Sequence, residues 1–538
     1  MRVEWVQHKG YDGERAAALL ERSASSNVFT NGGPLVARLE SEIRDRLGIA
    51  DGKAVVATSS GTGALWAAKA AMDVVYNRSL RFATQAFTFP SSAQGYLADS
   101  LVLDVDEGGG PSLAEADAVR DRIDGLIVTN VFGRVADIAR YSAWCKDNGK
   151  LLLLDNAATP LTVYRGTNSL NHGDAAICSL HHTKTLGFGE GGFVVCDGAM
   201  EMHVRRSLNF GIDNGSIKPE WNRFGGNYKM SELAAAGILQ FWDREFDGAV
   251  RRNREVFDEF VLMRPDAVLY PSHHDPGTTP VHLCIPVLLP RDSSETVRAL
   301  NDDGVMARRY YNPLSDGPRT ARFYSRIACV PCHAGIETAQ VYGISKHIPT
   351  EYSVRNCDVD RNESGVEASA RDRASYPFLR GFVGGFVRHC FTKFEPGRVL
   401  HVAPQDHGVC PGAEADTLDL DPDSGCTFIA DITRDNSELI PAGTYDTVIC
   451  TEVLEHTSDP FAALGELCRV TRAGGRAVIT VPCDFRMHGP LPDSWRFTEH
   501  GIRLMAERCG FRVAALLALE SAQRSLFPID YGAVLVKR

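Results

Sequence analysis

Long apolar runs are missing from this chain. No stretch approaches the roughly 18 consecutive apolar residues that a transmembrane helix needs. The first residues, Met1-Arg2-Val3-Glu4-Trp5, lack the apolar core of a secretion signal. Because the sequence indicates neither membrane insertion nor export, we expect a cytoplasmic protein.

An excess of positive charge is missing as well. The chain has 57 Lys and Arg against 68 Asp and Glu, a formal net charge of −11. This balance argues against broad electrostatic binding of nucleic acid or of an anionic membrane, and we expect neither partner. It leaves room for a local basic pocket that binds a phosphorylated substrate. Internal repeats and low-complexity tracts are also missing.

The 14 cysteines are scattered and form no regular array, which predicts free thiols within protein cores. Cys329-Val330-Pro331-Cys332-His333 has the spacing of a covalent haem attachment site and contains a thioredoxin-like spacing. Haem attachment of that kind requires export. We therefore expect a buried strand and turn at this segment, and no metal site.

With 538 residues, 44% hydrophobic and 23% charged, the chain is expected to form two or three soluble domains. Short apolar runs alternate with longer amphipathic segments, which predicts parallel strands joined by helices and an α/β fold. We expect a large domain at about 1–240, a small α/β domain at about 241–349 and a second α/β domain at 376–538. The polar, charged stretch at 350–375 is predicted to be a linker.

The most informative segment is Ser179 through Lys184, followed by Gly189 through Gly192. It places a lysine in a glycine-rich setting, after Asp155 at the end of the apolar run 151–154. A lysine amine can form an imine with an aldehyde cofactor, and a carboxylate can keep a pyridine nitrogen protonated. These two groups are the ones that pyridoxal phosphate (PLP) chemistry needs most.

Motifs along residues 1–349 carry a family resemblance. They are Ser60 through Leu65, Thr88-Phe89, Asp155 with Ala157, Ser179 through Lys184, Gly189 through Gly192, Asn227 through Glu232, and Val330 through His333. In this order they resemble the DegT/DnrJ/EryC1/StrS sugar aminotransferases. The resemblance implies PLP fold type I, with a large, mostly parallel sheet domain and a small α/β domain.

The resemblance also implies roles for single residues. Lys184 would bind PLP covalently and move protons, and Asp155 would pair with the pyridine nitrogen. Gly61, Thr62 and Ser179 would bind the phosphate, Phe89 would stack on the ring, and Asn227 would reach the phosphate of a neighbouring subunit. The last role implies a homodimer with shared sites.

Four positions depart from the family pattern. Ala158 stands where Gln or His is usual, Asn156 where a small residue is common, Asn130 where histidine is common, and Lys229 where arginine is common. Loss of one hydrogen bond at position 158 would cost about 1 kcal/mol, which would retune the site without abolishing it. A histidine in place of the lysine marks the related sugar dehydratases, and Lys184 argues against that class.

Residues 376–538 resemble a Rossmann-like class I S-adenosylmethionine (SAM) methyltransferase of the type 11 group. The matching pieces are Tyr445 through His456, Asp459-Pro460, Leu467 through Gly475, Ala477 through Pro482, and Asp493 through Thr498. The resemblance implies that Asp419, or failing it Asp421, binds the ribose of SAM and that Asp431 lies near the adenine. The loop at 401–408 departs from the pattern, because it has a single glycine and contains Pro404. His401, His407 and His456 suggest ordinary strand-end histidines more than a metal site.

These features predict a bifunctional enzyme of amino-sugar biosynthesis. Its first part would transfer an amino group from L-glutamate to a keto sugar on a nucleotide. Its second part would methylate the sugar, with the new nitrogen as one possible acceptor. Two alternatives remain open: the second part is a catalytically dead binding module, or the first part is a PLP-binding dehydratase or a non-catalytic regulator.

Overall fold

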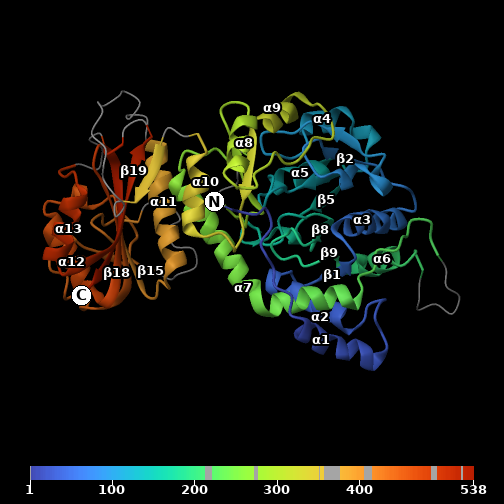
Figure 1. Ribbon diagram of the computed structural model, residues 1–538, viewed down its shortest axis with the longest axis horizontal. Coiled ribbons are helices and arrows are strands. Elements are labelled where there is room, and N and C mark those ends of the chain that lie inside the picture. Colours follow the sequence, from blue (N-terminus) through green and yellow to red (C-terminus); the bar gives the residue numbers. More distant parts are fainter. Residues whose placement is uncertain are drawn as a thin grey trace. The chain divides into compact units, whose positions relative to one another are not determined.

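The computed structural model describes residues 2–212, 221–271, 277–349, 352–356, 376–404, 415–485, 493–522 and 525–538. The chain forms two compact units (Figure 1). Unit 1 comprises Met1–Phe257 and Val268–His347, and unit 2 comprises Asp258–Ala267 and Ile348–Arg538. Unit 2 therefore includes a short piece of chain that lies far from the rest of it in the sequence.

A seven-stranded sheet forms the centre of unit 1, in the order β1-β9-β8-β5-β4-β2-β3. Only β9 runs antiparallel to its neighbours among these strands. The strands are β1 (Lys53–Thr58), β2 (Phe82–Gln85), β3 (Leu101–Leu103), β4 (Gly125–Thr129), β5 (Leu151–Asp155), β8 (Ala175–Ser179) and β9 (Gly192–Asp197). This mixed, mostly parallel sheet confirms the predicted fold class.

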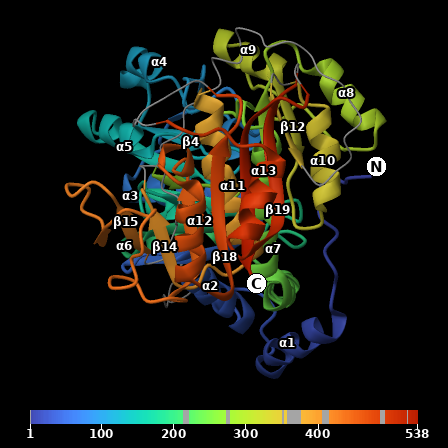
Figure 2. The same ribbon diagram turned by 90° about the vertical axis from the view of Figure 1, so that its left-hand side faces the viewer.

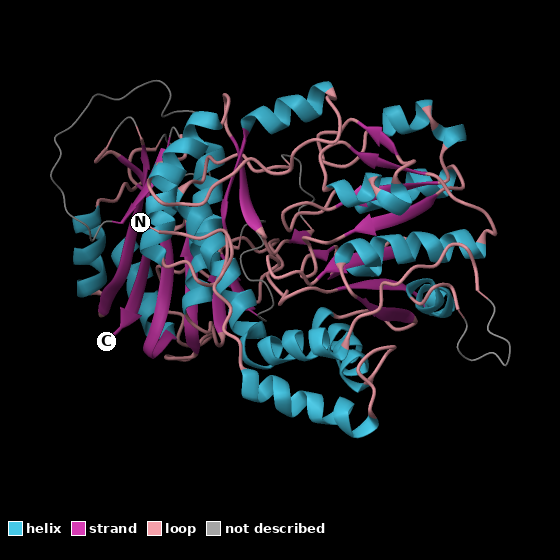
Figure 3. Ribbon diagram, turned by 45° about the vertical axis from the view of Figure 1, so that its right-hand side comes forward, coloured by secondary structure: helices cyan, strands magenta, loops and turns pink. Residues whose placement is uncertain are grey.

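Side-chain alternation explains why helices cover both faces of this sheet (Figure 3). Along β1, Ala54 and Val56 pack with helices α3 (Gly61–Val75) and α6 (Gly198–Leu208). Val55 and Ala57 point the other way, into a second core. That core includes residues of α2 (Pro34–Leu47), α5 (Ile138–Asp147) and α7 (Glu232–Met263).

The remaining elements of unit 1 are short, apart from the first helix. A two-stranded antiparallel pair, β11 with β12, forms the small α/β part. These elements are α1 (Gly13–Ser26), α4 (Leu113–Ala118), β6 (Val163–Tyr164), β7 (Thr167–Asn168), β10 (Thr278–Thr279), β11 (Cys284–Leu288), α8 (Ser294–Asp302), α9 (Pro318–Arg326), β12 (Ile327–Pro331) and α10 (Thr338–Lys346). Cys329 lies buried in β12 and Cys332 lies buried just after it, in agreement with the expected strand and turn.

Glu232, which the sequence places in a family motif, has a structural role. Its fully buried carboxylate accepts hydrogen bonds from the backbone N–H groups of Leu35 (2.7 Å) and Val36 (2.9 Å) and from the hydroxyl of Ser23 (2.6 Å). Helix α2 begins after Gly33, which has no side chain to cap it. Glu232 therefore supplies the N-terminal cap of α2 from a distant part of the chain.

We expect Glu232→Ala to lower the stability of unit 1 by about 3 kcal/mol, because buried donors lose a charged acceptor. Thermal unfolding followed by circular dichroism measures the effect. Glu107→Gln, at an exposed position, is the matched control and should leave the midpoint unchanged. Equal midpoints for the two variants would contradict the capping role.

The eight-stranded sheet of unit 2 has the order β13-β19-β20-β18-β17-β14-β15-β16. The strands from β16 through β18 are parallel, whereas β20 runs antiparallel to both β18 and β19. The strands are β13 (Tyr352–Asn356), β14 (Val399–Val402), β15 (Ala415–Asp419), β16 (Phe428–Ile429), β17 (Tyr445–Thr451), β18 (Thr471–Pro482), β19 (Phe511–Ser521) and β20 (Pro528–Lys537). The strand order reverses between β14 and β17, and ligands in such sheets bind at that crevice.

Helices cover both faces of this sheet. Helices α12 (Pro460–Val470) and α13 (Glu499–Arg508) pack on one face (Figure 2). Helix α11 (Tyr376–Lys393) packs on the other, where Phe382 and Phe386 lie in one cluster with Leu262. This Rossmann-like arrangement confirms the predicted fold of the second part of the chain.

Residues 352–356, inside the predicted linker, form the edge strand β13 and pair with β19. The polar composition that suggested a linker is also compatible with an edge strand, which has only one paired side. The rest of the predicted linker lies outside the described residues. Among the helices that the structure describes, none is long and apolar enough to cross a membrane.

Candidate active site

Asp155 is the last residue of β5, and its side chain is almost fully buried. One carboxylate oxygen, Oδ1, accepts a hydrogen bond from the Ala157 N–H at 3.0 Å, and Oδ2 lies 3.5 Å from the Thr129 hydroxyl. Burial raises the pKa of Asp155, while the Ala157 hydrogen bond and the charge of Lys184 oppose the increase. The carboxylate is thus held in place and depends on a nearby positive charge to stay ionised.

Lys184 follows β8, the strand that pairs with β5. Part of the residue is exposed to solvent, but protein surrounds its amine. Burial lowers the pKa of Lys184, and the negative charge of Asp155 opposes this decrease. The two predicted catalytic groups therefore lie in the same buried site. A lowered pKa increases the fraction of neutral amine, which is the nucleophilic form.

The N-terminus of α3 meets the end of β8 next to this site. Ser60 caps α3 by accepting a hydrogen bond from the Gly63 N–H at 3.0 Å. A Cβ atom on Gly61 would lie 2.7 Å from the Cβ of Ser179. Only glycine permits this approach, which brings Gly61, Thr62 and Ser179 together at a helix N-terminus. Such a cradle fits a phosphate group.

Phe89 lies at the start of a short helical turn and is half exposed, at 49%. Its ring packs edge-to-face on Tyr311, with 6.3 Å between the ring centroids. Tyr311 is buried, and burial raises its pKa, with a smaller contribution from the charge of Asp155. Phe89 is therefore linked to the site through Tyr311. Its stacking on a cofactor ring stays a prediction.

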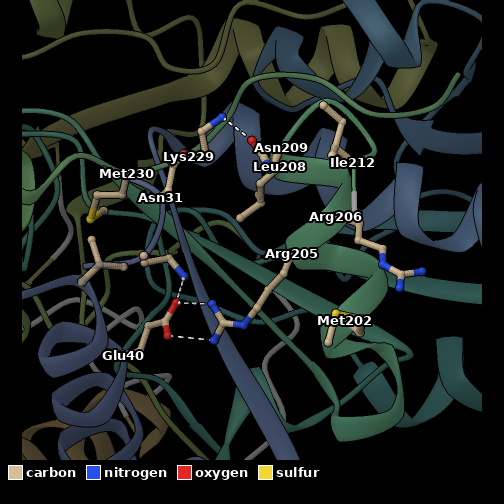
Figure 4. A pocket seen from close by; sticks show the side chains of 13 residues that line it. Asn31, Glu40, Met202, Arg205, Arg206, Leu208, Asn209, Ile212, Lys229 and Met230 are labelled. Atoms are coloured by element: carbon tan, nitrogen blue, oxygen red, sulfur yellow. Dashed lines mark hydrogen bonds and ion pairs between the residues drawn. The ribbon is translucent and has the colours of Figure 1, made fainter. Parts of the chain in front are cut away.

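Lys229 lines a cavity of about 300 Å³, which is shown in Figure 4. Lys229 Nζ donates to Oδ1 of Asn209 and to Oδ1 of Asn227, both at 2.8 Å. Across the cavity, Glu40 forms a two-point ion pair with Arg205 (Figure 4). Asn227 itself is exposed, and its contact with a phosphate of a neighbouring subunit stays a prediction.

Two of the departures from the family pattern contact each other. Asn130 Nδ2 donates to Asn156 Oδ1 at 2.5 Å, and Asn156 Nδ2 donates to Ser169 Oγ at 3.1 Å. Asn130 Oδ1 also accepts from the Ala136 N–H. Both amides are buried, so their hydrogen bonds compensate for the burial of polar groups. The pair fixes the backbone on either side of Asp155. Ala158 is buried as well and offers no polar group.

Lys9 is a positioning residue that the sequence did not reveal. Its amine donates to the carbonyl oxygens of His182 (2.8 Å), Lys184 (2.6 Å) and Gly187 (2.5 Å). Burial lowers the pKa of Lys9 to about 7. Its protonated form has three N–H donors for these three acceptors, so it ties the N-terminal segment to the loop that carries Lys184. No local motif marks Lys9, because its partners lie some 170 residues away.

We expect Lys9→Met to lower kcat of amino transfer by up to about 100-fold, because the loop loses three anchors and Lys184 is misplaced. The KM for the sugar should change little, since the Lys9 amine donates to three backbone carbonyl groups of the protein. Steady-state kinetics separate the two constants, and Lys346→Met at an exposed position is the control. A kcat within twofold of wild type would contradict the positioning role.

In unit 2 the predicted SAM residues lie at strand ends. Asp419 ends β15, and its Oδ1 accepts the Asp421 N–H at 2.9 Å. Asp431 follows β16 and accepts from both the N–H and the hydroxyl of Thr433. Burial raises the pKa of Asp431, but the Thr433 hydrogen bonds outweigh burial and lower it overall. A carboxylate at the end of β15, next to the crevice between β14 and β17, fits a ribose. His407 and the rest of 405–414 lie outside the described residues.

A buried lysine and a buried aspartate at one edge of a mostly parallel sheet, next to a helix N-terminus whose geometry fits a phosphate, agree with a PLP enzyme of fold type I. Residues 11–348 match the model of the DegT/DnrJ/EryC1/StrS aminotransferase family. The chain belongs to this family, whose cofactor is PLP. Residues 378–516 match a methyltransferase domain model, so the chain joins an aminotransferase to a methyltransferase domain.

Curated relatives match the aminotransferase part. A dTDP-4-amino-4,6-dideoxy-D-glucose transaminase of Shigella dysenteriae is 26% identical over 353 residues, which cover 59% of this chain and 90% of the relative. A dTDP-4-dehydro-2,3,6-trideoxy-D-glucose 4-aminotransferase of Saccharopolyspora spinosa is 24% identical over 328 residues, 55% of this chain and 83% of the relative.

Solved structures match the same part. DesI, crystallised with its TDP-sugar product, superposes with a TM-score of 0.55 at 23% identity, over 64% of this chain and 92% of DesI. Helicobacter pylori PseC superposes with a TM-score of 0.56 at 17% identity, over 64% of this chain and 98% of PseC. At these identities the likeness shows the fold.

Proposed function

We propose that unit 1 transfers an amino group, with L-glutamate as donor, to a keto sugar carried on a nucleoside diphosphate. The observation that carries this proposal is that the Lys184 amine and the Asp155 carboxylate lie in one buried environment, where the charge of each group acts on the pKa of the other. The names of the two curated relatives support a nucleotide-linked sugar as the substrate. The overall negative charge leaves phosphate recognition to local groups.

Each residue has a defined task in this reaction. Gly61, Thr62 and Ser179 hold the phosphate of PLP, Phe89 packs on its ring, and Asp155 keeps its nitrogen protonated. When bound, PLP supplies a ring that accepts electrons from the reacting carbon. Lys184 would hold the cofactor covalently, and its amine, once released, would move the proton at the reacting carbon.

The proposal includes a homodimer in the cytoplasm. Asn227 is exposed and hydrogen-bonded to Lys229, so its amide lies on a surface that a second copy of the chain can reach. In the dimer, Asn227 would donate to the phosphate held by the partner's cradle. Each site would then be complete only in the pair.

We propose that unit 2 binds SAM, with Asp419 on the ribose and Asp431 near the adenine, and methylates the amino sugar. The presence of both domains in one chain supports consecutive steps, since a shared chain keeps product close to the next site.

Mass spectrometry of products tests both parts. Full-length protein is incubated with glutamate and a panel of nucleotide keto sugars, with and without SAM. We expect a mass change for replacement of oxygen by an amino group, and a further methyl group only with SAM. If no keto sugar gains nitrogen, the transaminase proposal fails.

One observation favours the second candidate function of unit 2, a methyltransferase-like binding module without catalytic activity. Ala403, directly after β14, has a φ of +48°, a conformation in which the family pattern expects glycine. A crowded loop there would weaken cofactor binding. Titration of SAM into the full-length chain measures binding, and the product analysis with SAM measures methyl transfer. Saturable binding together with methyl transfer excludes an inactive module.

A further inference from the structure

Buried carboxyl groups gather at one edge of the unit 2 sheet. Glu452 directly follows β17, and Asp530 lies near the start of β20. In the strand pairing of β18 with β20, Asp530 lies opposite Pro482, the last residue of β18. Because β20 runs antiparallel to β18, the start of β20 meets the carboxyl ends of β17 and β18. This is the edge at which ligands bind in doubly wound sheets.

Glu452 and Asp530 lie side by side, and each acts on the pKa of the other. Asp530 has no exposed surface, and the carboxyl oxygens of both residues are buried. Within the described part of the chain, no group forms a hydrogen bond of ordinary geometry with any of these four oxygens. A buried carboxylate without donors is costly, so the pair must share a proton or bind a cation.

The surroundings add negative charge rather than remove it. Burial raises the pKa of Glu452, and burial together with the charges of Glu452 and Glu455 raises the pKa of Asp530 well above its ordinary range. The positive charge in this group, Arg496, forms a two-point ion pair with Asp493, at 2.5 and 2.7 Å. The described residues contain no cluster with the geometry of a metal site. An organic cation therefore fits the pair better than a metal ion.

The position of the pair relative to the proposed nucleoside site indicates which cation it binds. Asp419 ends β15, on one side of the strand order reversal. Asp530 belongs to β20, which lies beyond β17 and β18 on the other side. A ligand held by Glu452 and Asp530 thus lies across the crevice from the ribose.

We propose that Glu452 and Asp530 bind the protonated amine of the methyl acceptor and that unit 2 is an amine N-methyltransferase. This inference rests on the proposed methyltransferase function. The carboxylate pair takes one proton from the ammonium group, which frees the lone pair of the nitrogen. The nitrogen then bonds to the methyl carbon of a sulfonium donor, the carbon–sulfur bond breaks, and its electron pair stays on sulfur. The bound proton leaves to solvent when the methylated ammonium product departs.

Binding measurements on the full-length chain test the site without turnover. The probe is dTDP-4-amino-4,6-dideoxy-D-glucose, titrated calorimetrically in the presence of S-adenosylhomocysteine, with the 4-hydroxy sugar nucleotide as comparison. We expect a binding event that the amine shows and the hydroxyl compound lacks. Glu452→Gln and Asp530→Asn should weaken this event at least about tenfold, because each removes a charged acceptor. Glu438→Gln, at an exposed position of the same unit, is the matched control.

The two substitutions keep shape and remove buried charge, so both variants should fold and melt no lower than wild type. If amine binding stays within twofold in both variants, the proposal is overturned. If SAM affinity falls in both variants while amine binding does not, the pair holds the ammonium group of SAM itself and the acceptor assignment is wrong. If amine binding is present but no methyl transfer occurs, the site stands and the proposed methylation fails. Transfer to a hydroxyl sugar at an equal rate would also overturn the proposal.

Discussion

Lys184→Ala is expected to abolish amino transfer, with kcat lowered by at least about 10³-fold. The amine of Lys184 has two tasks, to hold the cofactor covalently and to move a proton at the substrate carbon. Alanine can do neither, and proton transfer by a positioned side chain alone contributes ~10²–10⁴-fold. Burial lowers the pKa of this amine, which increases the fraction of its neutral, nucleophilic form.

The measurement combines kinetics with borohydride reduction and peptide mass spectrometry. Wild-type protein should carry the reduced PLP adduct on the peptide that contains residue 184, and the variant should carry none. Lys146→Ala, at an exposed position, should leave both results unchanged. SAM binding by unit 2 should persist in Lys184→Ala. An adduct on another lysine, or retained turnover, would remove Lys184 from its role.

Asp155→Asn should have the second largest effect, a fall in kcat of about 10²–10³-fold, typical for loss of one buried electrostatic partner of the reacting group. The amide keeps the shape and the Ala157 hydrogen bond but carries no charge, so the cofactor nitrogen loses its proton. A second consequence follows from the charge pair. The negative charge of Asp155 raises the pKa of Lys184, so its removal must lower that pKa further.

Two readouts check this prediction. Single-turnover kinetics measure the loss of rate, and the pH dependence of cofactor capture by the free amine measures its pKa, whose midpoint should move to lower pH in Asp155→Asn. Asp147→Asn, exposed at the end of α5, is the control. A midpoint that moves to higher pH would contradict the proposed charge pairing.

The sequence predicted the features that are marked by residues close together in the chain, namely apolar runs and short motifs. Runs such as Leu151–Leu154 predicted buried strands, and the family resemblance predicted that Asp155 and Ser179 belong to one cofactor site. The structure brings them together because parallel strands end on the same side. The fold and the family could therefore be predicted, because residues that are neighbours in the sequence reveal them.

Features built from distant residues could not be predicted. Lys9 reaches carbonyl groups of a loop some 170 residues away, and backbone acceptors leave no trace in the sequence. Glu452 and Asp530 are 78 positions apart, and their pairing follows from the antiparallel course of β20. Strand β13 was missed for a related reason. Its polar residues alone do not indicate a strand, and the strand forms by pairing with β19.

The inclusion of β13 and of residues 258–267 in unit 2 has a practical consequence for anyone who wishes to separate the two domains. A fragment that begins at residue 376 would lack β13 and would leave the edge of β19 open to pairing with other molecules. It would also lack Leu262, which packs with Phe382 and Phe386, and Glu259, whose carboxylate accepts from Lys393 at 2.9 Å. Proteolytic or genetic excision would therefore yield a methyltransferase that aggregates, and inactivating substitutions in the intact polypeptide are the sound way to study each half alone.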